Sequence, residues 1–219
     1  MRLQSAIFDM DGTLLDSMHI WTGLGPSLLR SMGIVPAPDL GQRLMVRTFR
    51  EGAALCKAEY HLTQSEEELM ELTKARVRDF YETQVLPKAG VQKFLSLLKM
   101  EGVWMYVATN TDRDLAEAAL KHTGLAGYFR GILTCGEVGA GKRESAEIYE
   151  RCLRRLRGTK QDTVVFEDSL HAIETAKAAG FRVCGVYDPS AEGDQETIRR
   201  ISDEYIRSFE ELFEATAPD

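Results

Sequence analysis

The sequence predicts an α/β fold with a mainly parallel β-sheet and a separate helical segment near its start. From residue 91 onward, short and nearly continuous apolar strands alternate with helices, which is typical of a buried parallel sheet. Residues 17–85 show helical periodicity without a clear strand. The chain has 219 residues, enough for a core and a small second domain. We therefore expect a core of residues 1–16 and 86–219 and a helical domain of residues 17–85.

The first strand is expected at Ser5–Phe8, an apolar run that meets the sequence Asp-Met-Asp-Gly-Thr at once. A helical stretch should follow. Gly23, Gly25 and Pro26 interrupt it, which predicts that this helix bends or restarts near Ser27.

A long helix should precede the return to the core. Thr63 or Ser65 can cap it, and Glu66 or Glu68 three residues later can complete a capping box. Its apolar face is expected to contain Leu69, Leu72, Val77 and Phe80.

The segment Pro87–Gly90 marks the change to alternating strands and helices. The expected helices are Val91–Met100, Asp114–His122, Ala146–Leu156 and Ala172–Ala179. The expected strands are Val103–Ala108, Ile132–Cys135, Thr163–Phe166, Val183–Val186 and Tyr205–Ile206. In such a sheet, ligands bind beyond the carboxyl ends of the strands.

Two carboxylates follow the first strand, at Asp9 and Asp11. Because alternate side chains of extended backbone point the same way, both can face one site. Such a pair suits Mg²⁺, which prefers hard oxygen ligands. One carboxylate can attack phosphorus, and the other can act as acid and base. Gly12 would let the chain turn beside a phosphate. The alternative is a plain turn, in which Asp and Gly are common.

Three later segments are weaker when taken alone. Thr109 follows a strand and can donate to a phosphate oxygen, although Thr and Asn there also suit a turn or helix cap. Lys142, on a glycine-rich loop, can neutralise phosphoryl charge or can simply be solvated. Glu167 and Asp168 can complete a metal site or favour a helix N-terminus.

Charge and composition limit the partners. Lys and Arg number 27 and Asp and Glu 34, a formal net charge of −7, which argues against nucleic acid or an anionic membrane surface. The four cysteines form no Cys-x-x-Cys pair and are expected to be reduced and packed as small hydrophobes. With no apolar run long enough for a signal peptide or a membrane span, we expect a cytoplasmic protein.

Taken in order, the four segments resemble those of the haloacid dehalogenase superfamily of phosphohydrolases, over nearly the whole chain. The sequence from Asp9 to Ser17 carries the most specific match. The helical segment resembles the small α-helical cap of the branch that contains phosphoglycolate phosphatases and β-phosphoglucomutases. The resemblance implies a Rossmann-like core and a cap that closes over the substrate.

The resemblance also implies roles for individual residues. Asp9 would be the nucleophile and Asp11 the acid/base. Mg²⁺ would be held by Asp9, the Asp11 carbonyl and Asp168, with Glu167 nearby. The phosphoryl group would be held by Thr109, Asn110 and Lys142. The segment departs from the family pattern after Lys142, where two prolines are absent and one residue is extra, so Arg143 is a second candidate for the lysine's role.

The expected substrate is a small phosphorylated metabolite, and a monomer is favoured. Arg47 and Arg50 in the helical segment can bind a substrate anion, although helix arginines are usually solvated. A phosphosugar mutase is the alternative. Mutases of this branch carry a cap histidine where this chain has Trp21, with His19 two residues earlier. A non-catalytic binding protein and a dehalogenase fit the intact acids less well.

Overall fold

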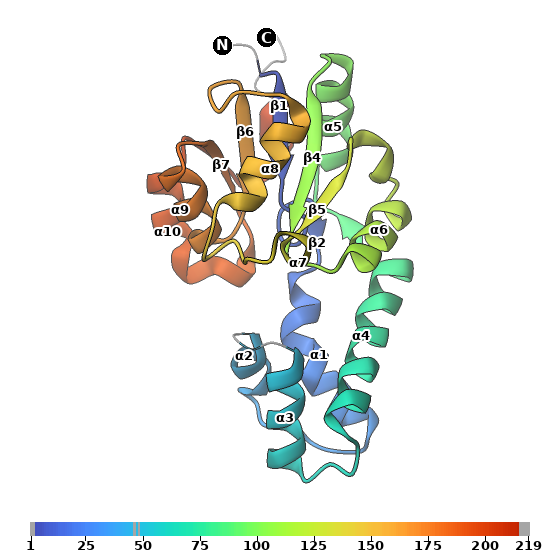
Figure 1. The fold of residues 1–219 in the computed structure, drawn as a ribbon. Helices are drawn as coiled ribbons and strands as arrows, with labels where there is room; N and C mark the ends of the chain where they lie inside the picture. Colours follow the sequence, from blue (N-terminus) through green and yellow to red (C-terminus); the bar gives the residue numbers. More distant parts are fainter. Residues whose placement is uncertain (1–2, 46, 48, 215–219) are drawn as a thin grey trace. The chain divides into compact units, whose positions relative to one another are not determined.

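The computed structural model describes residues 3–45, 47 and 49–214. The chain divides into two compact units (Figure 1). The core unit contains Met1–Asp16 and Val85–Asp219, and the helical unit contains Ser17–Gln84.

The core unit is built on a six-stranded parallel sheet with the order β5-β4-β1-β6-β7-β8. Its strands are β1 (Ser5–Phe8), β4 (Trp104–Thr109), β5 (Ile132–Thr134), β6 (Thr163–Glu167), β7 (Arg182–Val186) and β8 (Glu204–Ile206). The chain leaves β1 for β4 on one side and returns to β6 on the other. The carboxyl ends of these three strands therefore meet at the topological switch point, where α/β sheets bind ligands.

Helices cover both faces of this sheet (Figure 1). They are α5 (Val91–Met100), α6 (Arg113–His122), α7 (Cys135–Val138), α8 (Glu147–Leu156), α9 (Leu170–Ala178), α10 (Gln195–Ile201) and α11 (Glu211–Glu214). Ile7 of β1 belongs to an apolar cluster with α8, α9 and α10. Its neighbour Phe8 points to the other face and stacks on Phe166 at 4.5 Å, beside Phe94 of α5. Burial on both faces explains why the strands are apolar throughout, and the predicted α/β class is confirmed.

A small antiparallel pair stands beside the main sheet. It joins β2 (Leu15–Asp16) to β3 (Leu86–Pro87), the segments that flank the helical unit in sequence. The pairing fixes the chain that follows the Asp-Met-Asp-Gly turn against the start of the second core segment.

The helical unit contains α1 (Met18–Ser31), α2 (Leu40–Met45), α3 (Phe49–Tyr60) and α4 (Glu66–Thr83). Its own small core includes Leu29, Leu40, Cys56 and Leu69. The predicted capping box at the start of α4 is confirmed at Ser65, whose backbone N–H donates to Glu68 while its hydroxyl accepts from the Glu68 N–H.

The predicted restart near Ser27 is wrong, because α1 continues through Pro26, and the predicted bend stays a prediction. Proline has no N–H, so the Thr22 carbonyl one turn earlier loses its donor within the helix. Gly41 of α2 packs directly against that carbonyl, and a β-carbon at position 41 would collide with the Thr22 oxygen. Close packing of α2 against the Thr22 carbonyl therefore stabilises α1 at the turn where the sequence suggested an interruption.

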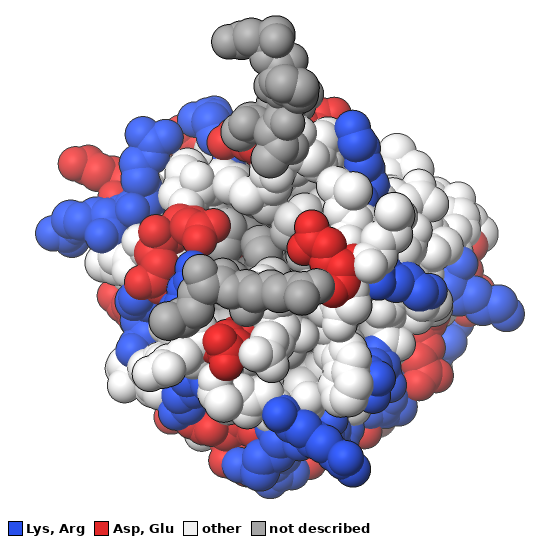
Figure 2. Space-filling view, turned by 90° about the horizontal axis from the view of Figure 1, so that it is seen from above, with Lys and Arg blue, Asp and Glu red and all other residues white. Residues whose placement is uncertain are grey.

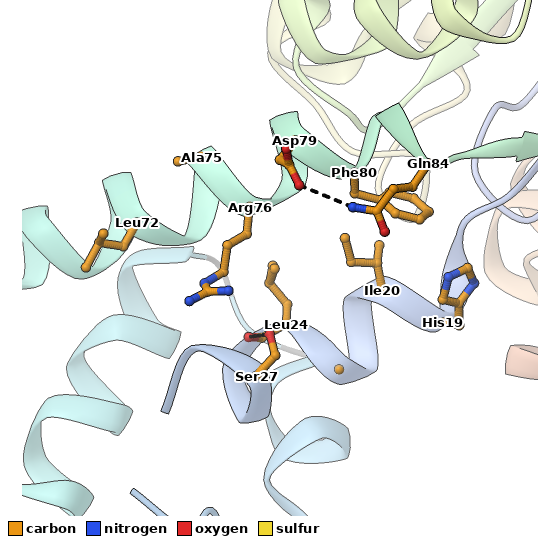
Figure 3. Close-up of a pocket in the computed structure, with 11 residues that line it drawn as sticks. His19, Ile20, Leu24, Ser27, Leu72, Ala75, Arg76, Asp79, Phe80 and Gln84 are labelled. Carbon is orange, nitrogen blue, oxygen red and sulfur yellow. Dashed lines mark hydrogen bonds between the residues drawn. The ribbon is translucent and has the colours of Figure 1, made fainter. Parts of the chain in front are cut away.

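Leu72 is a second correction. It was expected on the buried face of α4, but 42% of its surface is exposed, whereas Leu69, Val77 and Phe80 are buried. Leu72 instead lies at the rim of a groove between α1 and α4 (Figure 3).

This groove has a volume of about 590 Å³ and is lined by side chains of the helical unit alone. Its polar side chains already have partners. Arg76 donates to the Ser31 hydroxyl at 2.6 Å, and Gln84 donates to Asp79 at 3.2 Å (Figure 3). The exposed His19 ring meets Phe80 edge-on, with 5.3 Å between ring centroids.

Charged residues of both signs lie on the surface, and the four cysteines are buried. On the face shown in Figure 2, Lys and Arg are spread around the periphery and interspersed with Asp and Glu. All four cysteines are buried, with free thiols, as expected. Within the described part of the chain, the helices fall short of the length and apolar character needed to cross a membrane.

Candidate active site

Acidic side chains from two neighbouring strands meet at the switch point of the core unit. Asp9 follows β1, and its backbone N–H donates to the Phe166 carbonyl of β6 at 2.9 Å. Glu167 ends β6, and Asp168 follows it. The carboxylates of Asp9, Glu167 and Asp168 are all buried, with oxygens within 4.8 Å of one another. Parallel register has thus brought together acids that are more than 150 residues apart.

Lys142 reaches this cluster from the loop between α7 and α8. Its ammonium group is 2% exposed and donates to the Asp9 carboxylate and, at 2.6 Å, to Oε1 of Glu167. Burial alone would lower the pKa of Lys142, but these two carboxylates raise it well above its ordinary value, so the lysine is charged. Arg143 is exposed. The altered loop therefore still brings Lys142 into contact with Asp9.

Tyr149 is a member of the cluster that the sequence reasoning did not identify. Its hydroxyl donates to Oε1 of Glu167 at 2.8 Å, and its ring is fully buried in α8. The same oxygen accepts from Lys142. The sequence analysis assigned no role to this position, but a buried tyrosine hydroxyl needs a polar partner, which is the signal that could have found it.

Asp11 is held apart from the acidic cluster. Its Oδ2 accepts a hydrogen bond from the Thr111 hydroxyl at 2.7 Å. The Thr111 backbone N–H donates to the hydroxyl oxygen of Thr109 at 3.0 Å. Thr109 is buried at the end of β4, and Asn110 is exposed. The two acids of the first motif therefore have different neighbours: Asp9 contacts Lys142 within the buried cluster, and Asp11 accepts from Thr111.

Asp168 has its own set of neighbours. Thr13 donates to its Oδ1 at 3.0 Å. Burial, followed by the charges of Glu167 and Asp188, raises the pKa of Asp168 to about 7, while Thr13 and Lys88 oppose the rise. Burial is also the main cause that raises the pKa of Asp9 well above its ordinary range. Both shifts show that burial disfavours the ionised form of these two carboxyls, which a bound cation would favour.

The donor set fits a divalent cation. When all four are ionised, the buried carboxylates of Asp9, Glu167, Asp168 and Asp188 carry two more charges than Lys142 and Lys88, the largely buried lysines that contact them among the described residues, can balance. The ligands on offer are hard carboxylate oxygens, which suit Mg²⁺. We expect Asp9 and Asp168 to hold the ion, because one oxygen of Glu167 already accepts two hydrogen bonds, from Lys142 and from Tyr149.

Arg47 and Arg50 lie in the helical unit, and both are exposed. Arg47 donates to the Arg43 carbonyl. Arg50 lies 3.4 Å from Glu67 and 4.0 Å from Glu66. A role for either arginine in binding a substrate anion stays a prediction.

Comparison with protein-family models identifies the class of this chain. Residues 3–180 match the model of the haloacid dehalogenase-like hydrolases, and the chain belongs to that family. The match contains the three acids of the cluster, Asp9, Glu167 and Asp168, together with Lys142 and Tyr149.

Several curated relatives are phosphatases. The chain is 29% identical to a phosphorylated carbohydrates phosphatase of Thermotoga maritima over 185 residues, covering 84% of this chain and 85% of that protein. It is 25% identical to hexitol phosphatase B of Escherichia coli over 213 residues, covering 96% and 95% of the two chains.

Solved structures show the same architecture. A crystal structure from Thermotoga maritima, provisionally named a β-phosphoglucomutase, aligns with a TM-score of 0.82 and 28% identity over 97% of each chain. CbbY of Rhodobacter sphaeroides, crystallised with phosphate, aligns with a TM-score of 0.73 and 22% identity over 96% of each chain, which shows the fold alone.

Proposed function

We propose that this protein is a Mg²⁺-dependent phosphatase that hydrolyses a small phosphate monoester through a phosphorylated Asp9. The observation that carries the proposal is the separation of the two motif acids. Asp9 lies among buried charges in contact with Lys142, and Asp11 is held by Thr111. Membership of a hydrolase family and similarity to named phosphatases support the same activity.

In the first step, a carboxylate oxygen of Asp9 attacks phosphorus, and the bond from phosphorus to the leaving oxygen breaks. Asp11 gives its proton to that oxygen, which leaves as an alcohol. In the second step, Asp11 takes a proton from water as the water attacks the phosphorus of phospho-Asp9. Inorganic phosphate leaves, and the Asp9 carboxylate and the Asp11 proton are restored.

The surrounding residues lower the cost of bringing two anions together. Lys142 would move part of its interaction from Asp9 to the phosphoryl oxygens as the nucleophile is used. Thr109 and Asn110, at the end of β4, would donate to the same oxygens. Mg²⁺, when bound, would neutralise the remaining negative charge of the cluster and of the phosphoryl group.

We propose a phosphorylated carbohydrate or a related small metabolite as the substrate, on the strength of the names of the relatives. The helical unit would act as the cap that selects it, with Arg47 and Arg50 as candidate anion ligands. The free, buried thiols support a reducing, cytoplasmic setting.

A phosphosugar mutase is the second candidate, favoured by the name given to one similar structure. Incubation with β-glucose 1-phosphate and the matching bisphosphate separates the two activities. Free phosphate supports the phosphatase. Isomerised sugar phosphate without phosphate release would support the mutase.

The direct test of the proposed function is a screen of phosphorylated metabolites with Mg²⁺, using the wild type and Asp9→Asn. We expect phosphate release that Asp9→Asn abolishes, because an amide is a far weaker nucleophile than a carboxylate. Asp194→Asn, an exposed aspartate in the same unit, is the matched control and should keep full activity. Absence of phosphate release by the wild type across the panel would indicate a non-catalytic binding protein.

A further inference from the structure

Lys88, which lies outside the four family motifs, contacts the loop that carries Asp11. It follows β3 directly. Its backbone N–H donates to the Leu14 carbonyl at 2.9 Å, and its ammonium group donates to the Gly12 carbonyl at 2.7 Å. Lys88 therefore donates hydrogen bonds to two carbonyl oxygens of the turn that follows Asp11, those of Gly12 and Leu14.

The other contacts of the same ammonium group anchor it to the loop after β7. It donates to the Tyr187 carbonyl at 2.6 Å and to Oδ2 of Asp188 at 2.9 Å. With Gly12, these contacts use all three ammonium protons. The other oxygen of Asp188 accepts the Ser190 N–H at 2.9 Å, which fixes the carboxylate in turn.

The pair is too buried to be a simple surface salt bridge. The side chains of Lys88 and Asp188 are 15% and 2% exposed. Removing two charges from water costs about as much as their attraction returns, so a buried pair is weak ground for a role in stability alone. The hydrogen bond from Lys88 to the Gly12 carbonyl indicates that the pair also has a role at the Gly12 turn.

The Gly12 turn sets where Asp11 points. Gly12 adopts a left-handed conformation, with φ of 80°, and its N–H donates to the Leu15 carbonyl at 3.0 Å. The peptide between Asp11 and Gly12 is therefore part of a tight turn whose next carbonyl is held by Lys88. The Thr111 hydroxyl donates to the Asp11 carboxyl and so restrains the side chain of Asp11. Without the Lys88 ammonium group, the Gly12 carbonyl loses this donor and the turn is less firmly held.

We propose that Lys88, held by Asp188, is a positioning residue that keeps Asp11 in place to protonate the leaving group. The inference rests on the proposed function, in which Asp11 is the acid. Proton transfer requires the acid within hydrogen-bond reach of the leaving oxygen, so a small displacement of the turn reduces its contribution. The loss should depend on how much the leaving group needs a proton.

Two esters of nearly the same shape measure this dependence. Phenyl phosphate has a basic leaving group, whereas the leaving group of p-nitrophenyl phosphate departs readily without a proton. We expect Lys88→Met to lower kcat/KM about 30-fold for phenyl phosphate and only about threefold for p-nitrophenyl phosphate. The value of kcat/KM is used because it reports formation of phospho-Asp9 and not its later hydrolysis.

The unpaired Asp188 in this variant could itself weaken the fold. Lys88→Met combined with Asp188→Asn removes that buried charge and should keep the same difference between the two esters. Lys177→Met is the matched control, because Lys177 forms a 2.7 Å pair with Asp203 far from the turn in sequence. It should leave both esters unaffected.

Equal losses for the two esters, in the single and the double variant, would overturn the inference and reduce Lys88 to a structural role. Unchanged activity toward both esters would overturn it as well. The proposed function fails in a different way, which is visible without the variant: the wild type would release phosphate from neither ester.

Discussion

The same kinds of charged residues occur in the acidic cluster of the core unit and on the surface of the helical unit, in very different environments. The side chains of Lys142 and Glu167 are 2% and 1% exposed and contact each other. Lys142 also donates to Asp9, and Glu167 also accepts from Tyr149. Arg50 and Glu67 of the helical unit are 62% and 70% exposed and 3.4 Å apart. In the core the charges have been removed from water, and in the helical unit they remain in it.

The difference decides what each pair can do. An exposed ion pair is screened and contributes between zero and about 1 kcal/mol to stability. A buried set with surplus negative charge is costly unless a cation completes it, and sites of that kind cluster where chemistry takes place. The predictions that follow test this contrast from its largest expected effect to its smallest.

Removal of the metal should have the largest effect. Treatment with EDTA should abolish phosphate release, and Mg²⁺ should restore it, because the cluster then lacks the charge that balances the phosphoryl group. Mg²⁺ should also raise the free energy of unfolding, by about 2.7 kcal/mol at a concentration 100 times the Kd. Thermal melting with and without Mg²⁺ measures this second effect. Equal melting temperatures would contradict the assignment of the cluster as a metal site.

The Lys142→Met substitution should have the second-largest effect on activity. It removes the cation that contacts Asp9 and Glu167 and should lower kcat about 10²- to 10³-fold. Loss of the buried cation beside Asp9 and Glu167 should also destabilise the core by about 3–5 kcal/mol. Arg143→Met is the control, since this exposed neighbour should tolerate the change. A larger loss in Arg143→Met would mean that the altered loop delivers the arginine and not the lysine.

Tyr149→Phe should have a moderate effect. The phenyl ring keeps the packing of α8, and only the hydrogen bond to Glu167 is lost. A buried carboxylate that loses one donor should cost about 1–3 kcal/mol of stability. We expect kcat to fall about tenfold with little change in KM, because Glu167 then competes more strongly for Lys142. An unchanged kcat would show that Lys142 alone positions Glu167.

Glu67→Gln in the helical unit should have the smallest effect. It breaks the exposed pair with Arg50 and should change the free energy of unfolding by less than about 1 kcal/mol. Chemical denaturation measures this change, and activity should be retained. A loss above 2 kcal/mol would contradict the contrast between buried and exposed charges.

Much of the fold could be predicted because strands of the core are buried on both faces. That burial makes them continuously apolar, and the expected strands fall within about one residue of those observed. The restart expected in α1 was wrong because α1 continues through Pro26, where a distant glycine, Gly41, packs on the carbonyl that the proline leaves without a donor in the helix. A local pattern carries no information about such a contact.

The site was predictable where its residues follow strands and less so where they arrive from elsewhere. Asp9, Thr109, Glu167 and Asp168 all stand at the ends of neighbouring strands, so parallel pairing alone brings them together. Tyr149 comes from a helix face that looks like ordinary core. The proposed role of Lys88 and Asp188, like that of Tyr149, can be recognised only from tertiary contacts.

The central claim is that Asp9 carries the phosphoryl group, and it can be tested by trapping that intermediate in Asp11→Asn. With p-nitrophenyl phosphate, the first step needs little acid, whereas hydrolysis of phospho-Asp9 lacks its base. We predict a burst of about one p-nitrophenolate per enzyme, the expected stoichiometry of a covalent intermediate. Mass spectrometry after acid quenching should find one phosphoryl group on the peptide that contains Asp9. A linear time course with unmodified protein, or a phosphoryl group on another residue, would contradict the account.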